Sequence, residues 1–151
     1  MNPPQLTHLI YTSAAAPGIG APDLKIILEA ARTKNSQKSI TGMLLHTSGS
    51  FFQVLEGEET TLLELFATIS SDPRHLKVTK IIQEPIAKRA FGDWTMGFTD
   101  VDESELESIT GFSDFFQNGN SLTNLLSGRA KKLVSAFAEG RWRARLDGGP
   151  K

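Results

Sequence analysis

Two β-favouring runs in the middle of the chain, residues 39–47 and 50–57, are separated by only a Ser-Gly pair. A connection this short is typical of a β-hairpin. An amphipathic helix pattern precedes the hairpin at residues 23–34, and a second one follows it at residues 58–71. Further strand-like runs lie at residues 5–12, 78–83 and 91–98. The hairpin therefore stands at the centre of a β-α-β-β-α-β-β order.

This order predicts an α+β fold of the ferredoxin-like type, a five-stranded mixed sheet with both helices on one face. The first helix is expected to begin at the capping residue Asp23 and to end just before Asn35. We expect the first and third strands to be parallel neighbours, so that Tyr11 and Gln53 meet under the helices. The apolar stripes of the two helices are Leu24, Ile27, Leu28 and Ala31, then Leu62, Phe66 and Ile69.

The segment after residue 100 differs from the rest of the chain in its sequence pattern. Residues 5–100 carry the β/α pattern and are expected to form one domain. Residues 101–145 begin with an acidic stretch and include an amphipathic helix pattern at 121–139. We expect them to form a helical cap on the bare sheet face, directly behind the fifth strand. Residues 146–151 are expected to be a flexible tail.

Composition excludes several classes of function. The chain has 151 residues, of which 39% are hydrophobic and 22% charged, as expected for one globular domain. Its formal net charge of -1 gives no reason to expect nucleic acid or an anionic membrane as a partner. Because cysteine is absent, disulfides, thiolate metal sites and thiol catalysis are excluded. No membrane-spanning run or signal peptide is recognisable, so a cytoplasmic location is expected.

Gln53 interrupts an otherwise apolar strand. Successive side chains of a strand face opposite ways, so Gln53 shares a face with Phe51 and Leu55. If that face is the core face, the amide is buried, and leaving it without partners costs about 1–3 kcal/mol. Either backbone or a ligand must therefore satisfy its donors and its carbonyl.

Several motifs are too weak to assign a function. Residues 17–20 (Pro-Gly-Ile-Gly) lie between a strand and a helix, but they lack the G-x-G-x-x-G spacing of a dinucleotide site. His8, His46 and His75 have no metal-ligand spacing and are interpreted as ordinary polar residues. No Ser-His-Asp arrangement can be proposed from spacing. These motifs leave enzymatic chemistry without a candidate centre.

Five polar or electron-rich side chains remain: Tyr11, Asn35, Gln53, Trp94 and Met96. Most also have an ordinary structural interpretation. Tyr11 can pack with its hydroxyl at the rim of the core, and Asn35 can cap a helix. Trp94 and Met96, placed on the expected fifth strand, can be a core pair. Periodicity alone leaves both interpretations open.

Six motifs occur in order along residues 6–100. They are residues 9–13 (Leu-Ile-Tyr-Thr-Ser), Asn35 with residues 40–44 (Ile-Thr-Gly-Met-Leu), residues 51–57 (Phe-Phe-Gln-Val-Leu-Glu-Gly), residues 72–75 (Asp-Pro-Arg-His), residues 84–89 (Glu-Pro-Ile-Ala-Lys-Arg) with Phe91, and residues 94–96 (Trp-Thr-Met). Together they make the chain resemble the BLUF domains, a family of blue-light sensors that use a flavin.

The resemblance implies that a flavin ring sits between the two helices. It assigns Tyr11 as the electron donor and Gln53 as the amide between tyrosine and flavin. It assigns Asn35 as the hydrogen-bonding partner of the ring's pyrimidine edge. Further residues implied near the flavin are Lys34, Ile69, Asp72, Arg74 and Met96, and those implied around the amide are Ser13, Trp94 and Met96.

The implied chemistry is a switch and not a turnover, so the resemblance indicates a photoreceptor and no enzyme. Electron and proton transfer from Tyr11 through Gln53 rearranges hydrogen bonds and leaves the flavin oxidised, as it began. The flavin is expected to be FAD, with FMN or riboflavin as alternatives. Lys34 stands where relatives often have histidine or asparagine, and Thr68 where some have a longer polar side chain. Both departures bear on affinity for the cofactor tail.

Output is expected to pass to a separate signalling protein or through a homo-oligomer, because the sequence carries no catalytic domain. Two rival interpretations stay open. One is a small flavin-dependent or acylphosphatase-like enzyme, since a fold does not fix a function. The other is an interaction module without a cofactor. A yellow purified protein excludes the module, and a reversible absorption shift under blue light excludes the enzyme as a complete account.

Overall fold

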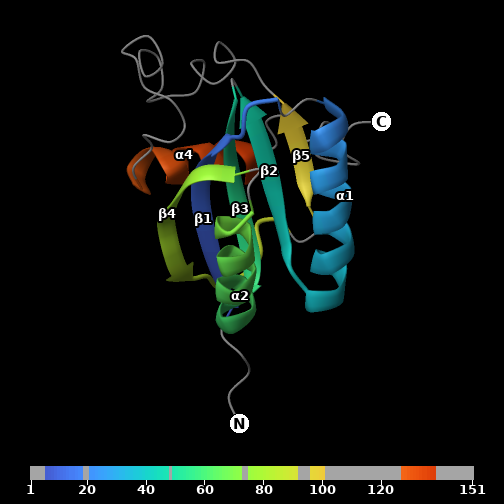
Figure 1. Cartoon of the computed structure of the whole chain (residues 1–151). Coiled ribbons are helices and arrows are strands. Elements are labelled where there is room, and N and C mark those ends of the chain that lie inside the picture. Colours follow the sequence, from blue (N-terminus) through green and yellow to red (C-terminus); the bar gives the residue numbers. More distant parts are fainter. Residues whose placement is uncertain are drawn as a thin grey trace.

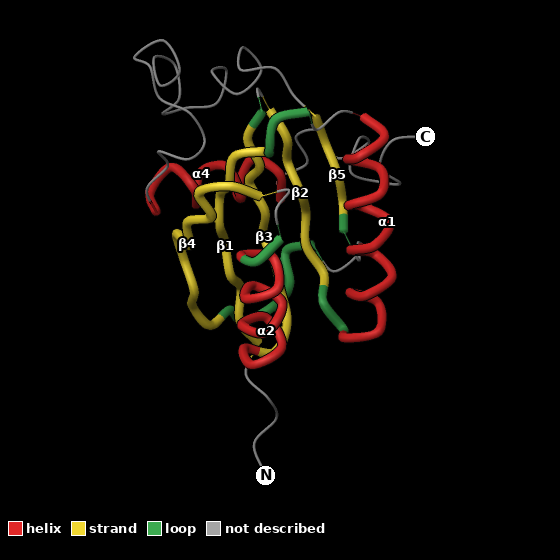
Figure 2. Tube along the Cα trace, in the orientation of Figure 1, coloured by secondary structure: helices red, strands yellow, loops and turns green. Residues whose placement is uncertain are grey.

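A five-stranded sheet with helices on both faces makes up the described part of the protein. The computed structural model describes residues 6–18, 21–47, 49–72, 75–91, 96–100 and 127–138. Helices α1 and α2 lie on one face of the sheet, and α4 lies behind it (Figures 1 and 2). In chain order the elements are β1 (Leu6–Ala15), α1 (Ala21–Lys38), β2 (Thr41–Thr47), β3 (Ser50–Glu58), α2 (Glu59–Ser70), β4 (His75–Pro85), β5 (Gly97–Asp100) and α4 (Ser127–Ala138).

The strand order is β4-β1-β3-β2-β5, which places β3 between β1 and β2. Strand β3 is antiparallel to both of these neighbours, whereas β2 and β5 are parallel. The α+β class is confirmed, but the expected parallel pairing of the first and third strands is wrong. The crossover through α1 leaves β1 and β2 running the same way, and the hairpin at Gly49 then reverses β3 between them.

Helix α1 is longer than its apolar stripe indicates. It begins at Ala21, two residues before Asp23, and continues to Lys38. It ends where Ser39 adopts a left-handed conformation with φ 58°, and the Ile40 N–H donates to the Asn35 carbonyl at 3.0 Å. A hydrogen bond of this kind after a left-handed residue is a common way for a helix to end, and the left-handed residue is here a serine and not the usual glycine. Asn35 therefore lies inside the last turn of α1, and the prediction that it follows the helix is wrong.

The last two strands also differ from their predicted bounds. Strand β4 begins at His75 and is longer than residues 78–83. Strand β5 begins only at Gly97, so both Phe91 and Met96 lie outside it, in bends. The Phe91 N–H donates to the Glu56 carboxylate at 3.0 Å and not to a strand ladder.

Both faces of β3, the central strand of the sheet, are buried. Every residue of β3 from Ser50 to Gly57 is buried. On the helix side, β3 packs into a core with α1 and α2, whose members are Leu9, Tyr11, Ile27, Leu28, Ile40, Leu44, Phe51, Leu55, Leu62 and Met96. On the opposite side, Phe52, Val54 and Glu56 are each 0% exposed. The sheet therefore separates two interiors, one of which includes a buried carboxylate.

Helix α4 covers part of the face opposite α1 and α2 (Figure 1). It buries Ala130 and Leu133, and Lys131 Nζ lies 3.5 Å from Glu84 Oε1 on β4. Its main contacts are with β4, at the other edge of the sheet from β5, so for α4 the expected position directly behind the fifth strand is wrong. The rest of the expected cap, at 101–126 and 139–145, lies outside the described residues, as does the tail. None of the described helices is long and apolar enough to cross a membrane.

Candidate functional site

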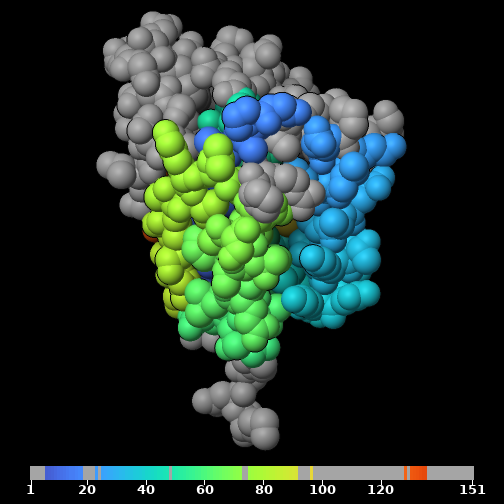
Figure 3. Space-filling view, viewed as in Figure 1, coloured from blue at the N-terminus to red at the C-terminus, as the bar shows by residue number. Residues whose placement is uncertain are grey.

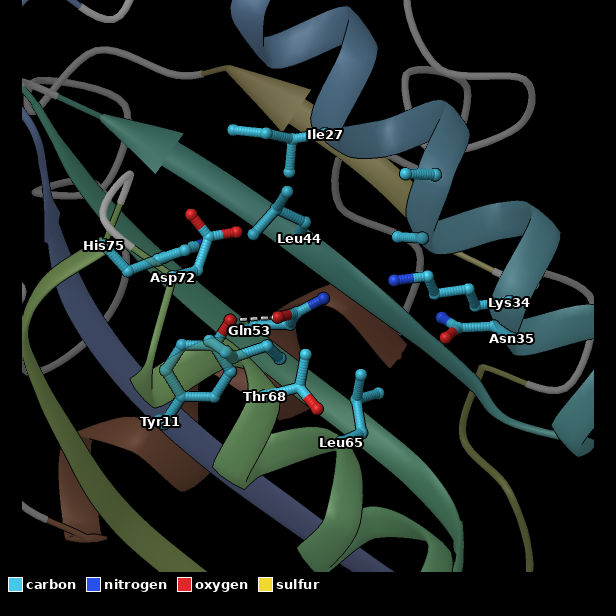
Figure 4. A pocket seen from close by; sticks show the side chains of 13 residues that line it. Tyr11, Ile27, Lys34, Asn35, Leu44, Gln53, Leu65, Thr68, Asp72 and His75 are labelled. Carbon is cyan, nitrogen blue, oxygen red and sulfur yellow. Dashed lines mark hydrogen bonds between the residues drawn. The ribbon is translucent and has the colours of Figure 1, made fainter.

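Tyr11 and Gln53 face each other on the helix side of the sheet. The register of β1 and β3 pairs their Cα atoms directly, and their side chains are 0% and 5% exposed. The Tyr11 hydroxyl donates a hydrogen bond to Gln53 Oε1 (Figure 4). The other end of the amide, Nε2, donates to Met96 Sδ at 3.3 Å. Gln53 thus uses its acceptor end for the phenol and its donor end for the thioether.

A cleft between α1 and α2 opens above this pair. It has about 630 Å³ of empty space, part of which is open to solvent. Figure 3 views this side of the molecule, with α2 in green and α1 in light blue. The floor comes from β1, β2 and β3, and the walls come from both helices and the start of β4. The lining residues are Tyr11, Ile27, Ala30, Ala31, Lys34, Asn35, Leu44, Gln53, Leu65, Thr68, Ile69, Asp72 and His75.

Asn35 and Lys34 form the polar part of the α1 wall. Asn35 is 1% exposed, whereas the neighbouring Lys34 is exposed at the rim. Both side chains point from α1 toward the cleft (Figure 4). An amide side chain offers a donor and an acceptor side by side. Asn35 therefore suits a flat ligand whose edge carries an adjacent N–H and C=O.

The Tyr11 phenol is held in its protonated form. Burial, and secondarily the nearby Asp72 carboxylate, raise the pKa of Tyr11 well above its usual value, because both disfavour a phenolate. The Tyr11 ring also packs against Phe66 of α2, with ring centroids 5.6 Å apart. The hydroxyl is therefore a fixed donor toward Gln53 at neutral pH.

His75 connects the cleft to the end of β1. Its Nδ1 lies 2.8 Å from Ser13 Oγ, and its ring packs against Phe51 at a centroid distance of 4.9 Å. The same ring meets Tyr11 edge-on at 6.3 Å. Among the described residues, no cluster of three or more His, Cys, Asp or Glu residues is arranged to hold a metal. The Ser13–His75 hydrogen bond fixes the wall beside Tyr11.

The structure brings most of the predicted site residues together. Tyr11, Lys34, Asn35, Gln53, Ile69 and Asp72 all line the cleft. Met96 reaches Gln53 from outside the lining, and the hydrogen bond of Ser13 goes to His75. Arg74 and Trp94 lie outside the described residues.

Sequence reasoning missed several lining residues, notably Leu44 and His75. Leu44 pairs with Gln53 across the hairpin. Counting outward from the Ser-Gly turn, where Thr47 faces Ser50, places these two side by side, so the signal was present in the sequence. His75 was interpreted as an ordinary polar residue, because its role depends on Ser13, which is 62 positions away. Thr68 was noted as a departure from relatives but not placed in the site.

Comparison with known proteins identifies the same region. A family model for BLUF, described as sensors of blue-light using FAD, matches residues 6–97. A photoactivated adenylate cyclase subunit beta of Euglena gracilis is 37% identical over 122 residues, covering 80% of this chain and 14% of that protein. The chain thus spans a small part of such relatives.

Solved structures give the same result for the fold. BlrB, described as a BLUF protein in its dark state, has a TM-score of 0.67 and 30% identity, covering 88% of this chain and 98% of BlrB. BlrP1 of Klebsiella pneumoniae, solved with FMN and cyclic diGMP, has a TM-score of 0.63 and 34% identity, covering 91% of this chain and 36% of BlrP1.

Proposed function

The chain belongs to the BLUF family of blue-light sensors that use a flavin, and on that premise we propose which residues sense the light. A flavin ring occupies the cleft between α1 and α2 without a covalent bond. Tyr11 is the electron and proton donor, and Gln53 is the switch. The observation that carries this proposal is the chain of hydrogen bonds that runs from Tyr11 through Gln53, both in the lining of the cleft, to Met96.

The residues that line the cleft suit a flavin. Apolar side chains from both helices, such as Ile27, Leu65 and Ile69, offer flat contact to an aromatic ring. The Asn35 amide supplies the complementary pair for the N–H and C=O of the ring's pyrimidine edge. Lys34 and Asp72 stand at the rim, where a ribityl chain or phosphate leaves the cleft. Arg74, the other proposed contact to this portion, lies outside the described residues.

FAD is the proposed flavin. The family description names FAD, whereas the BlrP1 structure was solved with FMN, so the two flavins share the ring-binding part of the site. Releasing the bound flavin by heat and identifying it by mass spectrometry tests this choice. Recovery of FMN or riboflavin as the main species from protein purified from its own cells contradicts it.

The residues of the chain make a reversible switch. A bound flavin supplies a ring that absorbs blue light and, once excited, accepts one electron. Tyr11 loses that electron, and its hydroxyl proton moves to its acceptor, Gln53 Oε1. When electron and proton return to Tyr11, the amide is left rotated or tautomerised, with its donor and acceptor ends exchanged. Nothing is consumed, so the cycle is a signal and not a turnover.

We further propose that the signal leaves through Met96 and the segment that follows it. Met96 contacts the switching amide, and β5 begins at the next residue. An amide that exchanges its ends presents a carbonyl in place of an N–H to Met96 Sδ, and this contact is lost. The proposed readers are a separate signalling protein or a second copy of the chain, with residues 101–145 as the output segment.

A light-minus-dark absorption spectrum of the purified protein tests the proposed function. The expected result is a yellow protein whose flavin bands shift reversibly to the red under blue light and return in the dark. A yellow protein with no reversible shift contradicts the sensor assignment, and a colourless protein that does not take up added flavin contradicts flavin binding in the cleft.

A further inference from the structure

Glu56 is a buried carboxylate that the proposed photochemistry does not use. It is 0% exposed and faces the side of the sheet opposite the cleft. Its Oε2 accepts the Ala90 N–H at 2.6 Å, and its Oε1 accepts the Phe91 N–H at 3.0 Å. The Thr41 hydroxyl also donates to Oε1, at 2.9 Å. Glu56 thus binds the backbone at Ala90 and Phe91, from which the chain continues to Met96.

Arg89 extends this cluster to the end of α1. Its Nη1 donates to Thr41 Oγ1 at 2.7 Å and to the Glu56 carbonyl at 3.0 Å. Its Nη2 donates to the carbonyl of Ser39 at 2.7 Å, immediately after α1. The cluster therefore joins three places: the end of the helix that carries Asn35, the strand that carries Gln53, and the connection toward Met96.

Arg32 holds the other end of the same connection. From α1, its Nε donates to the Met96 carbonyl at 2.9 Å. The next residue, Gly97, pairs with Met43 as β5 joins β2. The chain is therefore fixed at Ala90 and Phe91 by Glu56, and again at Met96 by Arg32, with residues 92–95 outside the described ones.

We infer that Glu56 and Arg32 are positioning residues for the switch, which hold both ends of the 90–96 connection so that Met96 Sδ faces Gln53 Nε2. This inference rests on the proposed role of Gln53 and adds residues outside the cleft. A carboxylate only accepts hydrogen bonds, so Glu56 has no alternative arrangement with its three donors. The Gln53 amide does have an alternative arrangement, because its donor and acceptor ends can be exchanged. The contacts of Glu56 and Arg32 thus hold Met96 in place while the amide changes.

Two variants, Glu56→Gln and Arg32→Lys, test the inference in the flavin-loaded chain. Each keeps the size or charge of the side chain and disturbs one anchor. Glu84→Gln is the matched control, because Glu84 lies on β4 and bonds to His8 and Lys131, away from the connection. Each variant is also made together with Met96→Leu, which removes the sulfur but keeps the carbonyl that Arg32 holds.

The first readout is the rate of return to the dark state after illumination. Because the Gln53–Met96 contact belongs to the dark arrangement, loosening either anchor is expected to slow recovery by about two- to fivefold, with flavin occupancy unchanged. In the Met96→Leu background the same substitutions are expected to change the rate by less than about 1.5-fold, because their effect passes through Met96. Glu84→Gln is expected to leave the rate unchanged.

The second readout is the ¹H–¹³C signal of the Met96 methyl group. The chain has only three methionines, so Met96→Leu assigns this signal directly. Both anchor variants are expected to shift it, and Glu84→Gln is not. If the variants slow recovery equally with Met96 or Leu at position 96, or leave the methyl signal in place, the inference is wrong. A wild-type protein with no red shift instead overturns the proposed function itself.

Discussion

Strand β3 presents two polar side chains, three residues apart, to the two sides of the sheet. Gln53 faces the cleft and has two neutral partners, Tyr11 and Met96, one at each end of its amide. Glu56 faces the opposite interior and accepts three hydrogen bonds, from Thr41 and from two backbone N–H groups. An amide can exchange its ends and a carboxylate cannot.

The comparison indicates how a small domain combines a movable part with a rigid one. On the cleft side, a rearrangement of Gln53 trades one set of neutral hydrogen bonds for another, so the two states can lie close in free energy. On the far side, a change at Glu56 leaves the buried N–H of Phe91 without its acceptor, which is costly. The strand itself stays fixed while one side chain changes.

The largest expected effect is that of Tyr11→Phe. The ring still packs against Phe66, so flavin binding is retained, but the hydroxyl that gives up the proton is lost. The long-lived red-shifted state is expected to be absent from the light-minus-dark absorption spectrum. A variant that still forms this state at the wild-type yield shows that Tyr11 is not the donor.

Glu56→Ala tests the rigid side of the comparison. The substitution leaves the buried N–H of Phe91 without its acceptor and removes the acceptor of the Ala90 N–H, and we expect it to lower the free energy of unfolding by about 1–3 kcal/mol. Denaturant unfolding measures the change. The double variant Tyr11→Phe/Gln53→Leu is the control on the cleft side, with an expected loss below about 1.5 kcal/mol, because apolar groups of similar size replace both partners of the neutral hydrogen bond. Equal losses in the free energy of unfolding would show that the two sides of β3 do not differ in rigidity.

Asn35→Ala tests whether the α1 wall recognises the flavin edge. Removing the amide is expected to weaken flavin binding by about 1–3 kcal/mol, roughly 5- to 150-fold in Kd, because the ring's N–H and C=O lose their partners. Fluorescence titration of the apoprotein with flavin measures Kd. Gln37→Ala, an exposed residue in the same helical turn, is the control and is expected to leave Kd unchanged. A similar Kd for both variants would remove Asn35 from the site.

The pH dependence of Tyr11 gives a smaller effect with a definite sign. Tyr11 is the single tyrosine of the chain, so tyrosinate absorbance reports on it alone once the Tyr11→Phe spectrum is subtracted. Its pKa is raised in the folded state, so the folded protein binds the proton more tightly than the unfolded chain. Stability from this group is therefore complete below about pH 10 and falls by about 1.4 kcal/mol per pH unit above it. A folded apoprotein that forms tyrosinate near pH 10 would contradict this.

The order of elements and much of the cleft were predictable, because they depend on local patterns. Helical stripes and strand alternation mark α1, α2 and the hairpin, and the short turn fixes that Leu44 faces Gln53. The direction of β3 relative to β1 was also implied by the crossover and the hairpin together.

Other features depend on pairs of residues far apart in the sequence. The end of α1 is set by the left-handed Ser39, a conformation that its residue type does not signal. Phe91 lies outside β5, and the backbone at Ala90 and Phe91 is bound by Glu56, 34 and 35 positions away. His75 enters the cleft through Ser13. No local pattern contains these contacts, so they required the structure.

The central claim, that the Gln53 amide is the moving part, is tested most directly by light-minus-dark infrared spectroscopy of protein with isotope-labelled glutamine side chains. The account predicts a label-sensitive amide carbonyl band that changes on illumination, reverses in the dark, disappears in Gln53→Leu and persists in Glu56→Gln. If the wild-type difference spectrum shows a full flavin signal but no label-sensitive glutamine band, the amide does not move and the account is wrong.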